Sequence, residues 1–542
     1  MLVSPPARSL DLVNLAVESL EANSFEVQGI ATEVDFTDDN KVIVKASAQS
    51  INHEEFGRFS EIRFTCPAEF YDRQFRCRQG HLSARHGEQG KIEARLDVTY
   101  GIGRGYSGDI RITASELLLQ AIEPIWRRYS ETGAGQKAVS GHVNGSLDLE
   151  LLNNQPQRVA STLELQNVSV EGENVLESVN MELGLEGSRV NGTWEINSTI
   201  KATEGLMYIV PGFEVLGDRP GFYLDLNDTE LELAASGHLD ETRQRLSLTS
   251  FRFMHPQRLQ LSGRAVFDTA ANTARELILN IRADDLARVY PVYIEPLLLA
   301  TNFYNLEIAG SLRLDLEYRN ESLARLHLKL DDVYLDDADQ RFSLSGLSTD
   351  MLLGESVHNA VSSLQWQSMS VYKLVFGAGD ITMQTGGGDV NVIDWQDVDV
   401  LDGTLLINRL SLDDIGNRDF RLSLHGELTP VSLKTFTQNM GWPLLSGKLS
   451  GQIDGLEYQH GDLRVNGDFA FGVFDGKVLL EGLHIENLFN INSRLYTSIK
   501  IRDLDLEQIT LPARNVEAYL SAFLRHRPLP GSLRDAVAYS LL

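Results

Sequence analysis

The chain has 542 residues and a formal net charge of −28 at pH 7, and 42% of its residues are hydrophobic. This length exceeds the roughly 250 to 300 residues that one hydrophobic core serves, so we expect several domains or one long array of small cross-section. The negative charge repels phosphate backbones, so nucleic-acid binding is not expected. No run of 18 apolar residues is present to cross a bilayer as a helix.

The first residues show no secretory signal. A basic start followed by an uninterrupted apolar core is missing, because Asp11 and Glu18 break the apolar stretch. Ser9 is a suitable N-cap for a helix. Four apolar residues that follow it recur at the spacing of one helical face: Leu10, Val13, Val17 and Leu20. We therefore predict an amphipathic helix within residues 1–25.

The two cysteines, Cys66 and Cys77, lie in a first β segment that we place at residues 26–114. Each ends or lies in a short β-like stretch, so the two side chains could face each other across a hairpin. One interpretation is a disulfide, which points to an oxidising compartment such as the periplasm. The other is a pair of reduced thiols in a cytosolic chain. His81 and His86 follow at a spacing that matches no familiar zinc finger, so we expect no metal and no other cofactor.

Two glycine clusters favour turns rather than ligand sites. The first, YGIGRGYSGD at residues 100–109, has the glycine content of a phosphate-binding loop. A helix should open at such a loop, whereas a strand-like stretch follows here. We predict a bend between strands at this cluster and a turn at QTGGGD, residues 384–389.

Apolar and polar residues alternate along most of the chain, which is typical of antiparallel strands with one apolar face. In residues 467–489 the alternation is interrupted by Asp475-Gly476, a strong signal for a hairpin turn. We therefore predict a mostly β fold: an elongated, curled antiparallel β-sheet, or β-groove, built from long meanders interrupted by short helices. The apolar residues that alternate toward one face are candidates to line the groove or, alternatively, to fill a closed core. They are Ile110, Ile112, Leu147, Leu149, Leu224, Leu226, Leu246, Leu248, Leu312, Leu314, Leu316, Leu326, Leu328, Leu422, Leu424, Phe469, Phe471, Ile499 and Ile501.

Three proline-containing helical segments interrupt the strands, at residues 115–129, 284–304 and 430–447. Similar strand patterns restart after each one, near Gly145, Gly310 and Gly451, with a loose period. We therefore expect three repeats of a helix followed by a β-meander. Their bounds are 115–283, 284–429 and 430–510, and an atypical tail follows at 511–542.

No catalytic constellation is visible. The histidines are dispersed without H-E-x-x-H spacing, and no G-x-S-x-G elbow is present. A glycosidase needs only two carboxylates, but that pair cannot be chosen among 76 acidic residues without geometry. We name no catalytic residue and do not expect an enzyme.

Residues 284–350 and 430–510 resemble AsmA-like proteins in the order of their features. Each has a helix with internal prolines, followed by AGSLRLDLEY in the first stretch and by SGKLSGQIDGLEY in the second. This superfamily includes the TamB and YdbH types, which are intermembrane lipid carriers of diderm bacteria. The resemblance extends over roughly residues 110–510 and rests on feature order and glycine placement.

The resemblance implies a periplasmic β-groove along which phospholipid moves between the inner and outer membranes. Phospholipid acyl chains would lie on the apolar residues, and membrane or envelope proteins would meet the ends of the groove. It also implies an inner-membrane anchor at the N-terminus, which is not recognisable here, and residues 511–542 lose the alternation. One interpretation is a fragment of a longer protein, and the other is a genuine amphipathic helix at residues 511–542.

Two alternative functions remain open. The strands of an outer-membrane β-barrel also alternate apolar and polar residues. Such a barrel carries girdles of aromatic residues, which are not evident in this chain, where 8% of the residues are aromatic. A multi-domain β enzyme or glycan-binding protein would carry clustered Trp and Tyr residues, whereas the five Trp residues here are spread out.

Overall fold

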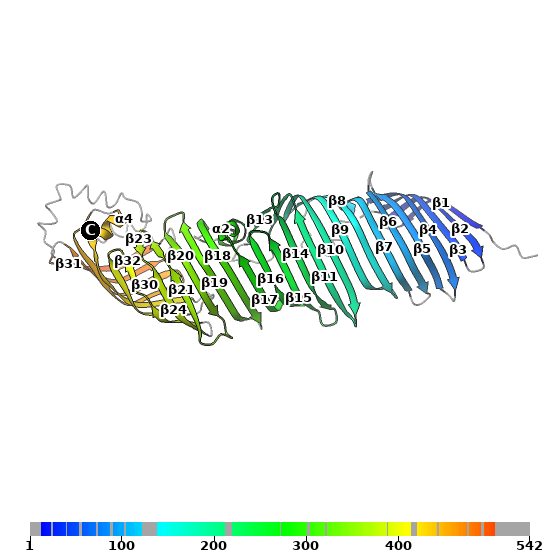
Figure 1. The fold of residues 1–542 in the computed structure, drawn as a ribbon. Coiled ribbons are helices and arrows are strands. Elements are labelled where there is room, and N and C mark those ends of the chain that lie inside the picture. Colours follow the sequence, from blue (N-terminus) through cyan, green and yellow to red (C-terminus); the bar gives the residue numbers. More distant parts are fainter. Residues whose placement is uncertain are drawn as a thin grey trace, which may run out of the picture. The chain divides into compact units, whose positions relative to one another are not determined.

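In the residues that it describes, the computed structural model of the protein has 32 strands and a few short helical segments. It divides into two compact units: residues 1–256 with 260–275 form unit 1, and residues 257–259 with 276–542 form unit 2. In each unit the strands lie side by side, mostly in chain order (Figure 1). The predicted mostly β, antiparallel meander is therefore confirmed. The structure describes residues 12–22, 25–38, 41–53, 57–71, 74–86, 90–101, 105–121, 138–211, 219–271, 273–299, 301, 304–319, 322–386, 389–413, 420–441, 444–473, 476–488 and 493–503.

Unit 1 is an antiparallel sheet in which long strands pair with their neighbours in sequence. The short strands β12 and β13 pair with each other beside β10, and β14 pairs with β11. The strands are β1 (Leu12–Ala22), β2 (Phe25–Asp38), β3 (Lys41–His53), β4 (Gly57–Tyr71), β5 (Gln74–His86), β6 (Gly90–Gly101), β7 (Gly105–Leu118), β8 (Ala138–Leu152), β9 (Gln155–Glu171), β10 (Val175–Val190), β11 (Thr193–Thr203), β12 (Leu206–Ile209), β13 (Phe222–Asp225), β14 (Glu230–Asp240), β15 (Arg245–His255) and β16 (Leu259–Asp268).

Unit 2 follows the same antiparallel plan, with shorter strands in its middle. Its strands are β17 (Thr273–Ala283), β18 (Leu306–Arg319), β19 (Ser322–Asp337), β20 (Phe342–Leu353), β21 (Ala360–Trp366), β22 (Ser368–Val371), β23 (Leu374–Phe376), β24 (Gly379–Gly386), β25 (Asp389–Trp395), β26 (Val398–Val400), β27 (Gly403–Asp413), β28 (Arg421–Ser432), β29 (Gly447–Gln459), β30 (Asp462–Val473), β31 (Gly476–Glu486) and β32 (Arg494–Arg502).

The predicted N-terminal helix is wrong over the part of it that the structure describes. Residues 12–22 form β1, which pairs antiparallel with β2 along its whole length. Val13 lies opposite Val34, and Leu20 lies opposite Val27. Pairing with β2 places the apolar side chains of these residues beside those of a neighbouring strand, a surface that a lone helix would lack, so tertiary pairing overrides the helical spacing.

The predicted turns are confirmed by the strand register. Val473 of β30 lies opposite Gly476 of β31, which leaves a two-residue connection at the Asp475-Gly476 signal. Gly101 pairs with Gly105 at the first glycine cluster, and β24 and β25 meet across the second. The connecting residues 102–104, 387–388 and 474–475 lie outside the described residues.

Cys66 of β4 and Cys77 of β5 form a disulfide with a Cα–Cα distance of 5.7 Å. Both cysteines are buried and pack with Val42 and Ala68. Of the two states that the sequence left open, the structure therefore has the oxidised one.

The predicted helix at residues 284–304 is a run of short helical turns. These are α2 (Leu286–Val289), the π-turn η2 (Tyr290–Ile294) and α3 (Glu295–Leu298). The Asp285 carboxylate caps α2 by accepting a hydrogen bond from the backbone N–H of Ala287 at 3.1 Å. Pro291 lies in the first turn of η2, and Pro296 lies in the first turn of α3. A missing backbone N–H is tolerated at these positions.

The other two predicted helices are shorter than expected. Within residues 430–447 the helix is α4 (Leu433–Met440), which ends at Gly441 in a left-handed conformation. Within residues 115–129 the end of β7 is followed by a single 3-10 turn, η1 (Leu119–Ala121), so no helix begins at Ser115. Residues 122–129 lie outside the described residues.

The best-buried apolar clusters lie where these short segments meet the strands. Leu119 of η1 packs with Leu117, Val139 and Val143 in unit 1. In unit 2, Leu286 and Val289 of α2 pack with Val333, and Leu433 of α4 packs with Leu449 and Val473. Each helical segment therefore covers part of the apolar face of its sheet.

Candidate functional site

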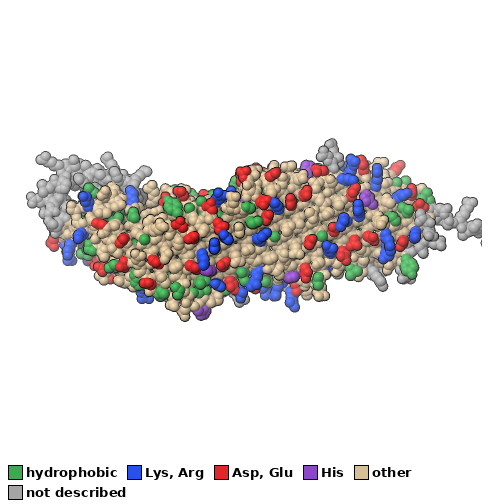
Figure 2. Space-filling view, viewed as in Figure 1, with side chains coloured by type: hydrophobic (Ala, Val, Ile, Leu, Met, Phe, Trp, Pro, Cys, Tyr) green, Lys and Arg blue, Asp and Glu red, His purple; other side chains and the backbone are tan. Residues whose placement is uncertain are grey.

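The two faces of each sheet have opposite chemistry. On one face charged residues of neighbouring strands pair, as in Lys45–Glu33 and Lys201–Glu230, both at 2.8 Å. Figure 2 shows acidic and basic side chains interspersed over the face in view. The alternate residues of the same strands are apolar and point to the other side. We call this second side the apolar face.

On the apolar face of unit 1, side chains line up from strand to strand. Residues directly opposite each other in a sheet lie on the same face, so the register identifies rows that cross the strands. The middle row consists of Phe64, Leu82, Ala94, Ile112, Leu147, Ser161, Leu185, Ser198, Ala235 and Phe251. The row on one side of it consists of Ile92, Ala114, Gly145, Leu163, Leu183, Ile200, Leu233 and Phe253. The row on the other side consists of Leu96, Ile110, Leu149, Val159, Gly187, Ile196, Gly237 and Leu248.

Burial on this face falls off within two residues along a strand. Leu231 of β14 is 8% exposed, whereas Leu233, two positions further on, is 40% exposed. Ala202 of β11 is 3% exposed, whereas Ile200 is 38% exposed. Leu185, in the middle row, is 41% exposed. Large apolar side chains in mid-strand positions are thus accessible to solvent, which a closed core would not allow.

A corresponding row crosses the first strands of unit 2. Leu314 of β18 lies between Ile281 of β17 and Leu328 of β19, and Leu328 lies opposite Met351 of β20. All four side chains are partly buried. The row lies beside the residues that α2 covers, because Leu312 and Leu330 pack against the cluster under that helix.

The structure places the predicted lining residues in four environments. The first group is half-buried on the apolar face: Ile110, Ile112, Leu147, Leu149, Leu246, Leu248, Leu314, Leu316, Leu328, Leu422 and Leu424. The second group packs, partly buried, against a core cluster: Leu312, Leu326, Phe469 and Phe471. Leu224 and Leu226 are fully buried, at 6% and 1% exposure, and therefore belong to the core rather than to an open surface. Ile499 and Ile501 are exposed on β32.

Several residues of the apolar face were not predicted from the sequence. Leu82, Leu96 and Leu185 lie in the same rows as the predicted residues. Small residues such as Gly145 and Ser161 occupy intervening row positions, so the rows are recognisable only through the register. The local signal was the same alternation, which continues through MELGL at residues 181–185.

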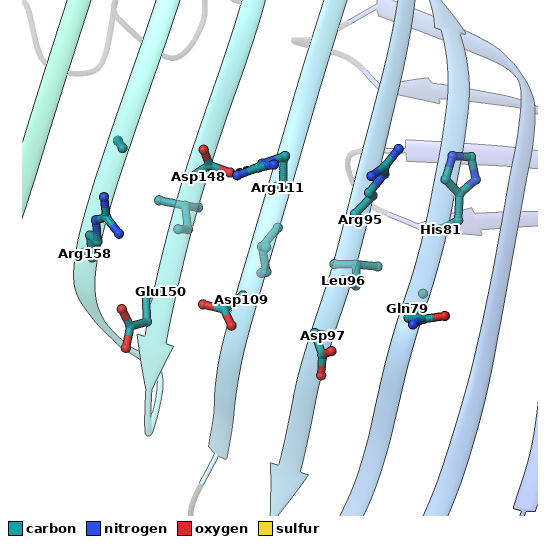
Figure 3. Close-up of a pocket in the computed structure, with 14 residues that line it drawn as sticks. Gln79, His81, Arg95, Leu96, Asp97, Asp109, Arg111, Asp148, Glu150 and Arg158 are labelled. Carbon is teal, nitrogen blue, oxygen red and sulfur yellow. Dashed lines mark hydrogen bonds and ion pairs between the residues drawn. The ribbon is translucent and has the colours of Figure 1, made fainter.

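The charged face of unit 1 has a surface hollow with a volume of about 660 Å³ (Figure 3). Three arginines and four carboxylates line it, and the Arg111 guanidinium pairs with the Asp148 carboxylate across β7 and β8. Arg95 lies directly opposite Arg111, and Asp97 lies opposite Asp109. Leu96, Ile110 and Leu149 also belong to its lining, beside the polar residues of the same strands. The hollow was not predicted from the sequence.

Among the residues that the structure describes, no group of three or more His, Cys, Asp or Glu side chains is placed to hold a metal ion. Within the same residues, no helix has the length and apolar character needed to cross a membrane.

No protein family and no curated protein matches this chain.

Proposed function

We propose that the chain is a lipid carrier whose apolar face holds the acyl chains of phospholipids. The observation that supports this proposal best is the run of accessible apolar side chains at Leu185, Ile200 and Leu233, on three neighbouring strands. Monomeric soluble proteins rarely expose a large contiguous apolar surface unless a ligand or partner covers it. The rows on either side extend the same surface across the strands of unit 1.

The geometry suits transport along the sheet rather than tight binding at one point. Exposing an acyl chain to water costs about 0.8 kcal/mol per methylene, and so about 12 kcal/mol for a chain of ordinary length. A chain that slides from one strand to the next on a continuous apolar surface exchanges equal environments and avoids that cost. Rows such as Ala94–Ile112–Leu147 would provide such steps. No catalytic step is required.

A periplasmic location fits this function. The Cys66–Cys77 disulfide is stable in an oxidising compartment. Envelope proteins at the ends of the apolar face would deliver and receive the lipid, as the resemblance to AsmA-like proteins implies.

Lipid extraction followed by mass spectrometry of the purified chain tests the proposal. We expect phospholipid to co-purify, and a photoactivatable phospholipid to crosslink to peptides that contain Leu185, Ile200 or Leu233. A chain that carries no lipid and takes up none from vesicles of phosphatidylethanolamine and phosphatidylglycerol would contradict it. Crosslinks confined to the charged face would contradict it as well.

A further inference from the structure

The hollow on the charged face of unit 1 contains two parallel rows of charged side chains. Neighbouring members of each row lie directly opposite each other on adjacent strands. The first row is basic and consists of His81 of β5, Arg95 of β6 and Arg111 of β7. The second row is acidic and consists of Asp97 of β6, Asp109 of β7 and Glu150 of β8. Figure 3 shows the two rows side by side across the strands.

The spacing of the rows matches a small ligand. Adjacent strands are about 4.8 Å apart, and two residues along a strand span about 7 Å. Arg95 and Arg111 therefore mark one side of a small rectangle, and Asp97 and Asp109 mark the other. The volume of the hollow, about 660 Å³, lies within the range of small-molecule sites, roughly 300 to 1,000 Å³.

This arrangement of charge disfavours the sheet itself. Like charges directly opposite each other on neighbouring strands are destabilising. The hollow contains three such pairs: Arg95–Arg111, Asp97–Asp109 and Asp109–Glu150. On β2 and β3, by contrast, Lys45 lies opposite Glu33 and pairs with it at 2.8 Å. A ligand that carries both charges would offset the repulsion in both rows.

The charged groups of the two rows are free to bind such a ligand. In the part of the chain that the structure describes, Arg95, Asp97 and Asp109 form no ion pair. Arg111 donates to the Asp148 carboxylate through Nε, which leaves its two Nη groups as donors. All four rectangle residues are exposed, so a ligand can reach them from solvent.

We propose that the hollow binds a small zwitterion with a phosphate and a primary ammonium a few bonds apart, as in phosphoethanolamine. Arg95 and Arg111 hold the phosphate, because the guanidinium fork matches phosphate oxygens. Asp97 and Asp109 hold the ammonium, whose three N–H donors need acceptors. The hollow lies on the face opposite the apolar rows, so this inference does not depend on the binding of acyl chains.

Titration calorimetry with phosphoethanolamine tests the site. At low salt we expect saturable binding with a Kd of about 0.1 mM, which a ligand of this size can reach. Inorganic phosphate alone and ethanolamine alone should bind at least tenfold more weakly, because each leaves one row without a partner. Raising the salt concentration from about 0.05 to 0.5 M should weaken binding, because screening reduces the attraction.

An exchange of charge within β6 separates binding from stability. Arg95→Asp with Asp97→Arg keeps the net charge and places opposite charges across β6 and β7. We expect the affinity for phosphoethanolamine to fall at least tenfold, whereas the melting temperature should be no lower than that of the parent. Arg313→Asp with Asp315→Arg, the same exchange on β18 of unit 2, is the matched control and should leave binding unchanged. The single change Arg95→Gln should weaken binding as well, and circular dichroism verifies that each variant is folded.

Vesicles distinguish the two sources of this chemistry, a free zwitterion and the headgroup of a lipid in a bilayer. The parent and the β6 exchange variant are compared on vesicles of phosphatidylcholine with and without phosphatidylethanolamine. Binding that requires phosphatidylethanolamine and is lost in the variant indicates the headgroup. Binding of phosphoethanolamine in solution, with no such difference on vesicles, indicates the free zwitterion.

The absence of saturable binding up to about 10 mM phosphoethanolamine would overturn the proposal. So would equal affinity for inorganic phosphate, because the acidic row would then contribute nothing. An exchange variant that binds as well as the parent, or a control that loses as much affinity, would overturn it too. Crosslinking of acyl chains reports on the opposite face, so a failure here leaves that assay unaffected.

Discussion

Ile200 of β11 and Leu233 of β14 lie directly opposite each other on the apolar face, 38% and 40% exposed. Each is two residues from a buried position on the same strand, so the boundary between core and accessible surface passes between adjacent rows. We expect this boundary to decide where a hydrocarbon chain can lie.

Leu233→Asp tests the accessible row. Because Leu233 is already 40% exposed, we expect the unfolding free energy to fall by only about 1 kcal/mol. Phospholipid binding should fall about tenfold, because the carboxylate must lose water where the acyl chain lies. The control is Ala234→Asp, which adds the same group on the opposite face. Equal loss of lipid with both variants would speak against a one-sided surface.

Leu314→Asp makes the same test in unit 2. Leu314 is half-buried between Ile281 and Leu328, so an accessible face predicts a modest fall in melting temperature and a clear loss of lipid crosslinking. The control is Arg313→Asp, at the exposed neighbouring position. Severe unfolding of the Leu314 variant, with no lipid ever bound to the parent chain, would refute the carrier function, since a buried unpaired charge signals a closed core.

Removal of the disulfide should weaken unit 1 without affecting the apolar rows. We expect Cys66→Ala with Cys77→Ala to lower the unfolding free energy by about 2 to 3 kcal/mol, because the unfolded chain regains the freedom of a short loop. Chemical denaturation measures the loss, and the parent chain with a reductant should show a similar one. Thiol labelling of the unfolded, unreduced parent should find no reactive cysteine, and two labelled thiols would contradict the disulfide.

The ion pair between Asp337 and Arg341 predicts a dependence of stability on pH. Burial alone would raise the pKa of Asp337, but hydrogen bonds from Arg341 outweigh it and lower that pKa below its ordinary value. The Arg341 Nη2 and Nε atoms lie 2.6 and 2.7 Å from the two Asp337 carboxylate oxygens. The stabilisation is therefore complete above the ordinary pKa near 4 and is lost as the pH falls through the lowered pKa.

We expect Asp337→Asn to cost about 2 to 4 kcal/mol at neutral pH, because it leaves a largely buried guanidinium without its carboxylate. Urea denaturation between about pH 5 and pH 2 should show this difference shrinking as the parent loses its pair. Asp339→Asn is the control, since Asp339 is exposed and 3.5 Å from Arg341. A constant difference across that pH range would contradict the assignment.

The sequence by itself determined the strands and their turns, because alternation and Asp-Gly or glycine-rich turns act over a few residues. It determined equally that helical turns lie within residues 284–304 and 430–447, although not where α2 begins or α4 ends. It misled at β1, where Val17 and Leu20 stand three apart, like residues on one helical face, although both lie in one strand that pairs with β2 without a shift of register.

Only the tertiary structure decided which apolar residues stay accessible. Leu224 and Leu233 occur in similar alternating patterns, yet the first is 6% and the second 40% exposed. The difference depends on what packs over each position, and so on strand register and on where η1, α2 and α4 lie. Those contacts join residues far apart in the chain, whereas alternation reports only on which side of its own strand a residue lies.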